Sequence, residues 1–244
     1  MRLGRVRRRL RTDSGTDRAA WQDRVGALSG AAYVLLILVG NQLAEGSGSS
    51  THQSGAQVLA HVGKQADSTS AQIGMTMEIL GFVGFAFFVP WLYAALRRAG
   101  SGWPAAVALV GGVSTLAVKF GSGATAITLM TDRERVDAQT AMVLNDLNSA
   151  AFVVSFITFG VFLLGAGLAL LESRLVGRFA AWSAVVLGVA GILLTLVTQA
   201  DPINSNPIPF LLGLVWILAV SVRLAVRAPR VDAQAVLAGA PAHA

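Results

Sequence analysis

Residues 147–171 read LNSAAFVVSFITFGVFLLGAGLALL, a run of 25 residues without a charged side chain. An α-helix rises about 1.5 Å per residue, so about 20 apolar residues cross the ~30 Å hydrocarbon layer of a bilayer. The run is therefore long enough to span a membrane. It does not alternate in polarity from one residue to the next, so it does not indicate a transmembrane β-strand.

Five more uncharged runs of similar length lie at residues 25–44, 79–96, 99–118, 179–200 and 202–222. Of the 244 residues only 13% are charged, about half the share found in an average soluble domain. Because lipid offers no water to backbone N–H and C=O groups, such spans must be helical. The sequence predicts an all-α, polytopic transmembrane helix bundle with six spans. They are expected at about residues 25–45, 73–97, 104–129, 147–171, 179–200 and 208–226.

Arginines set the predicted orientation of these spans. Fifteen of them fall on one side of the predicted topology, against Lys64, Arg133 and Arg135 on the other. The positive-inside rule then puts both termini in the cytoplasm, with the spans in a bacterial plasma membrane. The expected domains are a basic arm at residues 1–24, a transmembrane domain at 25–226 and a disordered tail at 227–244. The net charge of +6 follows from this topology, and basic residues in short turns do not indicate nucleic-acid binding.

The basic arm contains a cluster of arginines that could contact lipid. Its members are Arg5, Arg7, Arg8, Arg9 and Arg11. Each such residue near an anionic bilayer surface is worth about 1 kcal/mol, which favours binding of anionic lipid headgroups. The alternative is a solvated arm that only sets the orientation of the first span.

Two of the segments expected outside the membrane predict helices of their own. Residues 46–71 begin with a Gly/Ser-rich stretch, and Val58, Leu59 and Val62 then form one apolar side of a short interfacial helix. Thr131 and Glu134 fit a capping box, which predicts a helix start at about residue 132. A single helix from there to residue 171 would be about twice as long as the hydrocarbon layer is thick. Span four therefore either projects outward or breaks near Asn145.

Among the charged residues within or beside the predicted spans, three are candidates for a functional role: Glu78, Lys119 and Asp146. A charge at the bilayer centre costs about 2.5–3.5 kcal/mol or more, so each needs a reason to be there. All three are expected in the outer leaflet. Glu78 shares a helix face with Gly74 and Gly81, and faces of small residues pack against other helices.

An ion pair between Glu78 and Lys119, with Asp146 or Asn148 as a second partner, is the expected arrangement. Asn145 accompanies Asp146 on the fourth span, and Asn41 ends the first span on the same outer side. Together these residues form the candidate polar pocket. The sequence leaves two functions open for it. The pocket binds a small solute or relays a proton, as in a small transporter or solute-binding membrane protein. Alternatively, the charges only fix helix packing in a non-catalytic scaffold or partner subunit, which could be a homo-oligomer.

No catalytic, metal or cofactor site is expected. The chain has no cysteine, which excludes thiolate nucleophiles and Cys-held iron–sulfur clusters. His52, His61 and His243 all lie outside the predicted spans, so paired haem ligands within the bundle are not available. The sequence also contains no P-loop, HExxH or GxSxG motif.

The six spans, the arginine-rich cytoplasmic turns and the Gly-, Ala-, Val- and Leu-rich helices resemble uncharacterised six-span integral membrane proteins of high-GC actinobacteria. The resemblance covers the whole chain and is one of composition. It implies the same bundle architecture, and it assigns no functional residue.

Overall fold

In the computed structural model the described residues are 3–44, 53–198 and 207–238, and all of their regular elements are helices. The seven helices are α1 (Leu3–Ala44), α2 (Gly55–Ala66), α3 (Thr69–Arg98), α4 (Trp103–Thr131), α5 (Ala138–Ser173), α6 (Arg178–Val197) and α7 (Ile208–Ala238). In this part of the chain six helices are long and apolar enough to cross a membrane: α3 to α6, Ala20–Ala44 of α1 and Ile208–Val226 of α7. The prediction of an all-α bundle with six such helices is confirmed.

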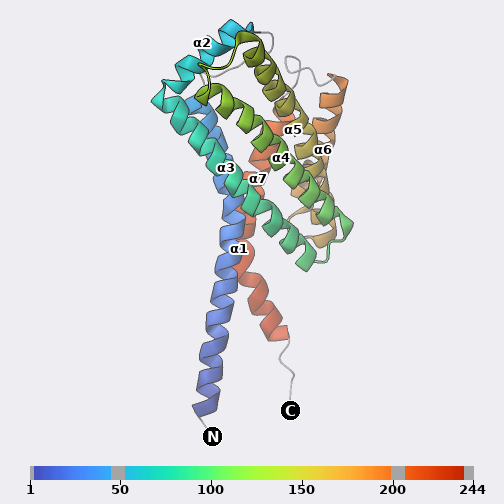
Figure 1. Cartoon of the computed structure of the whole chain (residues 1–244). Coiled ribbons are helices and arrows are strands. Elements are labelled where there is room, and N and C mark those ends of the chain that lie inside the picture. Colours follow the sequence, from blue (N-terminus) through green and yellow to red (C-terminus); the bar gives the residue numbers. More distant parts are fainter. Residues whose placement is uncertain (1–2, 45–52, 199–206, 239–244) are drawn as a thin grey trace.

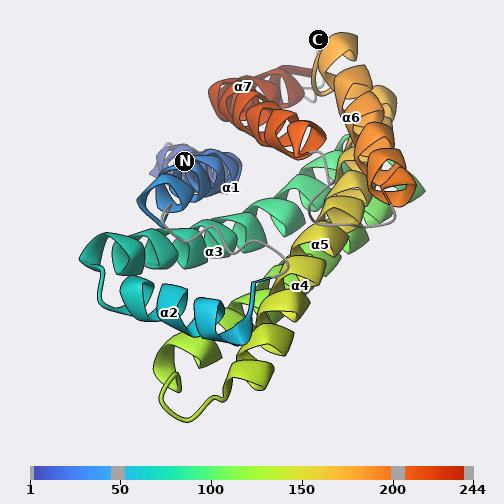
Figure 2. The ribbon, with the colours of Figure 1, turned by 90° about the horizontal axis from the view of Figure 1, so that it is seen from above.

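The helices pack mainly as neighbours in two groups. α1 packs against α3 and α7, while α5 packs between α4 and α6 (Figures 1 and 2). α2 lies across one end of the bundle, beside the connection between α4 and α5 (Figure 1). We call this the α2 end. The first turns of α1 and the last turns of α7 extend from the opposite end, which we call the terminal end.

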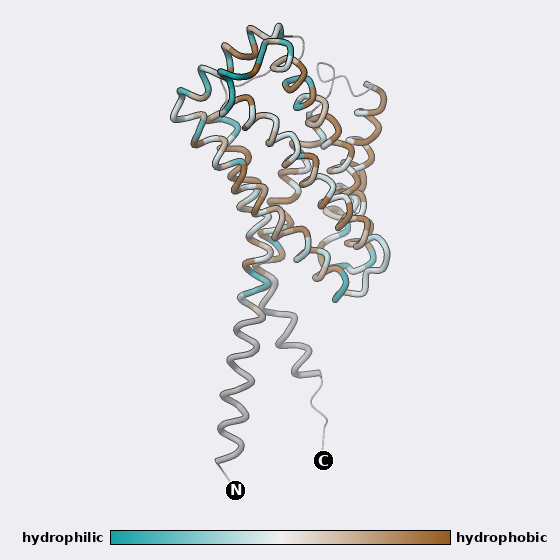
Figure 3. Tube along the Cα trace, in the orientation of Figure 1, coloured by the Kyte–Doolittle hydropathy of each residue, from teal (hydrophilic) through white to brown (hydrophobic). Residues whose placement is uncertain are grey.

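Apolar side chains cover much of the outward surface of the helices. Phe179 is 88% exposed and Val197 is 78% exposed. A large apolar surface of this kind is unfavourable in water. Hydrophobic residues run along the helices and hydrophilic ones gather near their ends (Figure 3). The surface is therefore one that lipid tails can cover.

Glycines let the helix backbones approach closely. A Cβ on Gly165 of α5 would overlap the backbone nitrogen of Ala108 on α4. On the other side of α5, a Cβ on Gly188 of α6 would lie 2.6 Å from the oxygen of Gly160. Close van der Waals contact of this kind is the main attraction between helices in lipid, where no hydrophobic effect drives them together.

The expected short helix in residues 46–71 is α2. Val58 and Val62 are buried with Leu129 and Ala141, so α2 packs on α4 and α5 rather than lying free at an interface. Ser54 forms the N-cap in a capping box with Gln57, which the sequence analysis did not identify.

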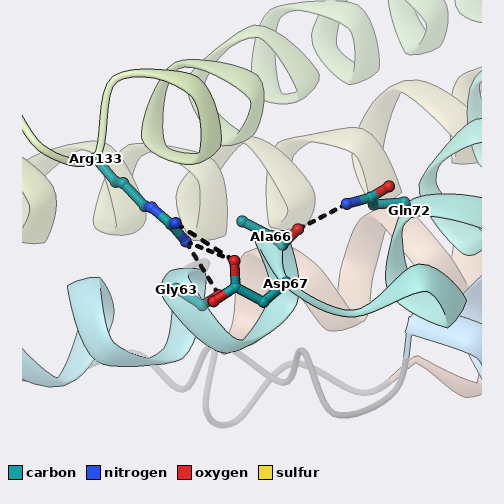
Figure 4. A network of polar contacts seen from close by, with 5 residues as sticks. All are labelled: Gly63, Ala66, Asp67, Gln72 and Arg133. Carbon is teal, nitrogen blue, oxygen red and sulfur yellow. Dashed lines mark hydrogen bonds and ion pairs between the residues drawn. The ribbon is translucent and has the colours of Figure 1, made fainter.

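The C-terminal end of α2 is held by Arg133, which lies between α4 and α5. Its guanidinium donates to the carboxylate of Asp67 at 3.3 and 3.4 Å and to the carbonyl of Gly63 at 3.2 Å (Figure 4). Asp67 is 75% exposed, so this ion pair contributes little to stability and mainly fixes where α2 ends.

The predicted capping box at Thr131 and Glu134 is wrong. The hydroxyl of Thr131 instead donates to the carbonyl of Ile127 in the last turn of α4. The next helix starts at Ala138, where Asp137 accepts a 2.8 Å bond from the backbone N–H of Thr140. This bond holds the pKa of Asp137 below its usual value, because it stabilises the carboxylate. An ionised cap near a helix N-terminus is also favoured by the helix dipole.

The fourth span is a single unbroken helix. α5 has 36 residues, equivalent to about 54 Å at 1.5 Å per residue. Since the hydrocarbon layer is only ~30 Å thick, α5 projects beyond it, and the alternative of a break near Asn145 does not occur. The projecting turns support α2.

Polar contacts hold helices together at the terminal end. The carboxylate of Asp23 accepts from the indole of Trp91 at 3.0 Å and from Arg98 at 2.7 Å, which joins α1 to α3. Glu172 accepts from Ser101 and from the backbone N–H of Gly102, so the last turn of α5 caps the start of α4. Gly102 has no side chain that could do this itself.

Helix continues further at both ends of the chain than the predicted spans. α1 begins at Leu3, and its side chains before residue 20 are outside the described part, as is the predicted lipid contact of the arginine cluster. α7 continues to Ala238, where the sequence predicts a disordered tail from residue 227. Residues 239–244 lie outside the description.

Replacing Gly165 with leucine should separate α4 from α5, because the new side chain meets backbone that cannot turn away. We expect a loss of about 1–3 kcal/mol or more, measured by thermal or denaturant unfolding of the purified protein in detergent. Gly121→Leu on α4 is the matched control, since nothing lies within 4 Å of its Cβ position. Equal stability of the two variants would contradict the proposed role of close glycine contact.

Candidate functional site

The structure places the predicted pocket residues on four helices. Glu78 on α3 and Lys119 on α4 are both partly buried, and Asn148 on α5 is partly buried as well. Asn145 is only 4% exposed, whereas Asp146 and Asn41 are exposed. These residues therefore do not all face one space.

Glu78 lies in the contact between α1 and α3. A Cβ on Gly40 of α1 would lie 3.0 Å from the Cγ of Glu78 and 3.2 Å from its backbone nitrogen. Gly74 and Gly81 are buried against α1 on the same face, which confirms that this face packs against another helix. The stem of Glu78 is thus fixed by close packing of backbone.

The predicted ion pair between Glu78 and Lys119 is wrong. The ion pairs among the described residues are Arg98–Asp23, Arg133–Asp67 and Arg135–Asp132. Glu78 and Lys119 still interact electrostatically, but at longer range than a contact. The physical reason is that Glu78 is directed by its packing on α1, while the partners of Lys119 lie on α5 and α7.

Lys119 lies against aromatic rings. Its Nζ is 3.9 Å from the centre of the Phe152 ring on α5 and 5.9 Å from that of Phe210 on α7. The negative face of an aromatic ring attracts a cation, with a free energy of about 0.5–2 kcal/mol depending on how dry the site is. Three helices thus contribute to the surroundings of one ammonium group.

Phe210 also belongs to a cluster of rings on α5. Its centre lies 5.3 Å from that of Phe156, 4.9 Å from Phe159 and 6.5 Å from Phe152. This ring cluster is not among the sites predicted from the sequence. The spacing of Phe152, Phe156 and Phe159 puts them on one face of a helix and was a readable signal. That Phe210 and Lys119 meet this face depends on how the helices cross, which spacing does not give.

A small crevice of about 10 Å³ adjoins this cluster, between α5, α6 and α7. Its lining includes Phe156 and Gly160 of α5, Leu187 and Gly191 of α6, and Pro209 and Phe210 of α7. Phe210 is therefore shared by the crevice and by the surroundings of Lys119.

The three polar residues of the fourth span divide between two faces of α5. Asn145 and Asn148 lie seven and four residues before Phe152, so they share the face that meets Lys119. Asp146 is on another face, is exposed, and makes no ion pair with the described residues. The amide nitrogen of Asn145 is buried and has no hydrogen-bond partner there.

These features define a multi-pass helical membrane protein with one partly buried lysine beside aromatic rings. Residues 28–228 match the family described as a domain of unknown function, DUF4386, and the chain belongs to that family. No curated protein and no solved structure matches the chain.

Lys119→Met and Phe152→Leu should be energetically coupled, because the cation and the ring stabilise each other. A double-mutant cycle on unfolding free energies should give a coupling of about 1 kcal/mol. Lys119→Met with Phe87→Leu is the control pair, since Phe87 on α3 is 67% exposed and is neither of the two rings that Lys119 lies over. A coupling no larger than that of the control would show that the contact contributes nothing.

Proposed function

We propose that the protein is a plasma-membrane solute-binding protein, of the kind found in small transporters, in which Lys119 binds the anionic group of a solute. The observation that carries the proposal is the position of this cation. It is partly buried in a membrane-capable helix, and its contacts among the described residues are aromatic rings rather than a carboxylate.

The free-energy cost of a charge within a span favours an anionic partner for Lys119. A charge at the bilayer centre costs about 2.5–3.5 kcal/mol or more, and a charge in the outer leaflet, where Lys119 is expected, costs part of that. Cation–π contacts offset about 0.5–2 kcal/mol. A solute carboxylate would offset more of this cost, because a charge-assisted hydrogen bond is stronger than contact with a ring.

Glu78 is the second charged group of this proposal. Its electrostatic interaction with Lys119 links the two without joining them directly. An anion at Lys119 would offset the positive charge near Glu78, and a proton taken up by Glu78 would restore the balance of charge. Proton uptake by Glu78 is the step that would link transport of the solute to a proton.

A scaffold or partner subunit is the second candidate. The glycine contacts of α5 with both α4 and α6 favour a scaffold, because they show that these positions serve helix packing. In that case Lys119 would be satisfied by Phe152 and Phe210 alone.

Binding of small carboxylates distinguishes the two candidates. With the protein in phosphatidylcholine nanodiscs, ligand-observed NMR should detect benzoate and butyrate but not the matched amides. Lys119→Gln should weaken this binding about tenfold or more, which is about 1.4 kcal/mol. Lys64→Gln, at an exposed lysine on α2, should leave it unchanged. Equal signals for acids and amides, or no effect of Lys119→Gln, would contradict solute binding at Lys119 and favour the scaffold.

Both termini are proposed to be cytoplasmic, with the α2 end outside the cell. Because the chain has no cysteine, single cysteines can report this directly. Glu134→Cys, in the connection between α4 and α5, should react with a membrane-impermeant maleimide in intact cells. Gly177→Cys, in the turn between α5 and α6, should react only after lysis; both positions are exposed. The reverse pattern would overturn the orientation.

A further inference from the structure

We infer that α2 is a movable lid, which opens at the α2 end to admit a small carboxylate to Lys119 from the surrounding water. The inference rests on the proposed function and adds the route by which the solute reaches that site. The juxtaposition that carries it is a helix packed apart from the main core, with unpaired polar atoms buried beside it. This helix lies at one end of the α5 face that meets Lys119.

α2 is attached to the bundle by a small contact. It has 12 residues, too few to cross a membrane, and it lies across the end of the bundle (Figure 1). The buried side chains of its contact with α4 and α5 form a cluster of their own, separate from the main apolar core: Val58, Val62, Leu129 and Ala141. A helix held by a satellite cluster can detach while the rest of the molecule stays folded.

Polar atoms are buried without partners where α2 is docked. Oε1 of Gln53, just before α2, and Nε2 of His61, on α2, have no hydrogen-bond partner among the described residues. The same holds for Nδ2 of Asn145, which lies one turn along α5 from Ala141. A buried polar atom without a partner costs free energy, and water would satisfy such atoms once α2 lifts. The closed position is therefore less stable than its apolar contacts alone would make it.

The polar contacts of α2 define a latch and a hinge. Arg133 is the latch, because its bonds to Asp67 and to the carbonyl of Gly63 join α2 to the connection between α4 and α5 (Figure 4). On the other side, Nε2 of Gln72 on α3 donates to the carbonyl of Ala66 at 2.6 Å. Release of the latch thus leaves α2 joined to α3, so the lid turns about residues 67–68 and moves away from α4 and α5.

The lid covers one end of a polar strip that leads to Lys119. From Ala141, which packs on α2, the same face of α5 continues through Asn145 and Ser149 to Phe152. Asn145 is 4% exposed and Ser149 is 8% exposed. Nζ of Lys119 lies 3.9 Å from the centre of the Phe152 ring. Amide and hydroxyl groups on this face offer hydrogen bonds to a carboxylate between the α2 end and the ammonium group.

Cysteine labelling in nanodiscs tests whether α2 opens. The chain has no cysteine, so Val58→Cys places one thiol in the contact of α2, where Val58 is 2% exposed. Val176→Cys is the matched control, since Val176 is 5% exposed in the turn between α5 and α6 at the other end of the bundle. With a sulfonated methanethiosulfonate reagent, followed by intact-protein mass spectrometry, we expect Val58→Cys to react at least tenfold faster. Thermal unfolding of both variants shows whether they are folded.

The latch gives this measurement a second control. Arg133→Gln removes the contact with Asp67 and should speed labelling of Val58→Cys about threefold, a small factor because an exposed ion pair is weak. Arg135→Gln, in the same connection, removes a charge that pairs with Asp132 and should leave the rate unchanged.

Tying the lid shut tests the route of the solute. Arg133→Lys brings an amine to the carboxylate of Asp67, and a water-soluble carbodiimide joins the two as an amide with loss of water. Arg135→Lys with Asp132 gives the same crosslink within the connection and leaves α2 free. Peptide mass spectrometry identifies the crosslinked protein. We expect ligand-observed NMR to lose the benzoate signal about tenfold with α2 tied, and to keep it in the control.

Each outcome decides one statement. If Val58→Cys reacts no faster than Val176→Cys, or its rate ignores Arg133→Gln, α2 is a fixed part of the bundle and the lid is overturned, while benzoate binding through Lys119 still supports the proposed function. If benzoate binds equally with α2 tied, the solute enters by another route, such as the bilayer, and the inference is wrong. If the unmodified protein binds no benzoate, the proposed function fails and the route fails with it.

Discussion

In hydrocarbon, helices attract one another by close van der Waals contact, so the attraction depends on how closely their backbones can approach. This constraint shapes the whole bundle. α5 shows its effect most clearly. Gly165 allows Ala108 of α4 to touch it on one side, and Gly160 allows Gly188 of α6 to touch it on another. Small residues on two faces make α5 the helix between its neighbours. The third face is left for larger side chains.

The candidate site follows from that arrangement. With α4 drawn close to α5, Lys119 lies over Phe152, and the ring cluster of α5 also receives Phe210 from α7. A cation at this place lies against an apolar ring and forms no ion pair with a carboxylate of the described residues. An aromatic face is the strongest partner that an apolar core can offer a charge, and it remains a weaker partner than an anion.

Much of the fold could be predicted because hydrocarbon thickness fixes helix length. Runs such as residues 147–171 predict spans whatever their neighbours are. Helix ends were less predictable. Thr131 and Glu134 fit a capping box, but the carboxylate of Asp137 caps the following helix instead. Partners across helices were not predictable. Opposite charge was the only basis for predicting a pair between Lys119 and Glu78. The packing of α3 against α1 places Glu78 beside Gly40, while Lys119 lies against Phe152.

Lysine at this position fits the proposed anion-binding role better than a role that only fixes helix packing. Nearly every other basic residue of the chain is arginine, and those with described partners lie near helix ends. Arg98 donates from one guanidinium nitrogen to a carboxylate, whereas Arg133 donates from two nitrogens to a carboxylate and also to a backbone carbonyl. An arginine at residue 119 would need several acceptors to satisfy five donors. Lysine carries a compact charge on a flexible stem, and one carboxylate is enough to neutralise it. A buried contact that fixes helix packing benefits from the rigid guanidinium group of arginine. A site that binds and releases an anion benefits from the single, mobile ammonium group of lysine.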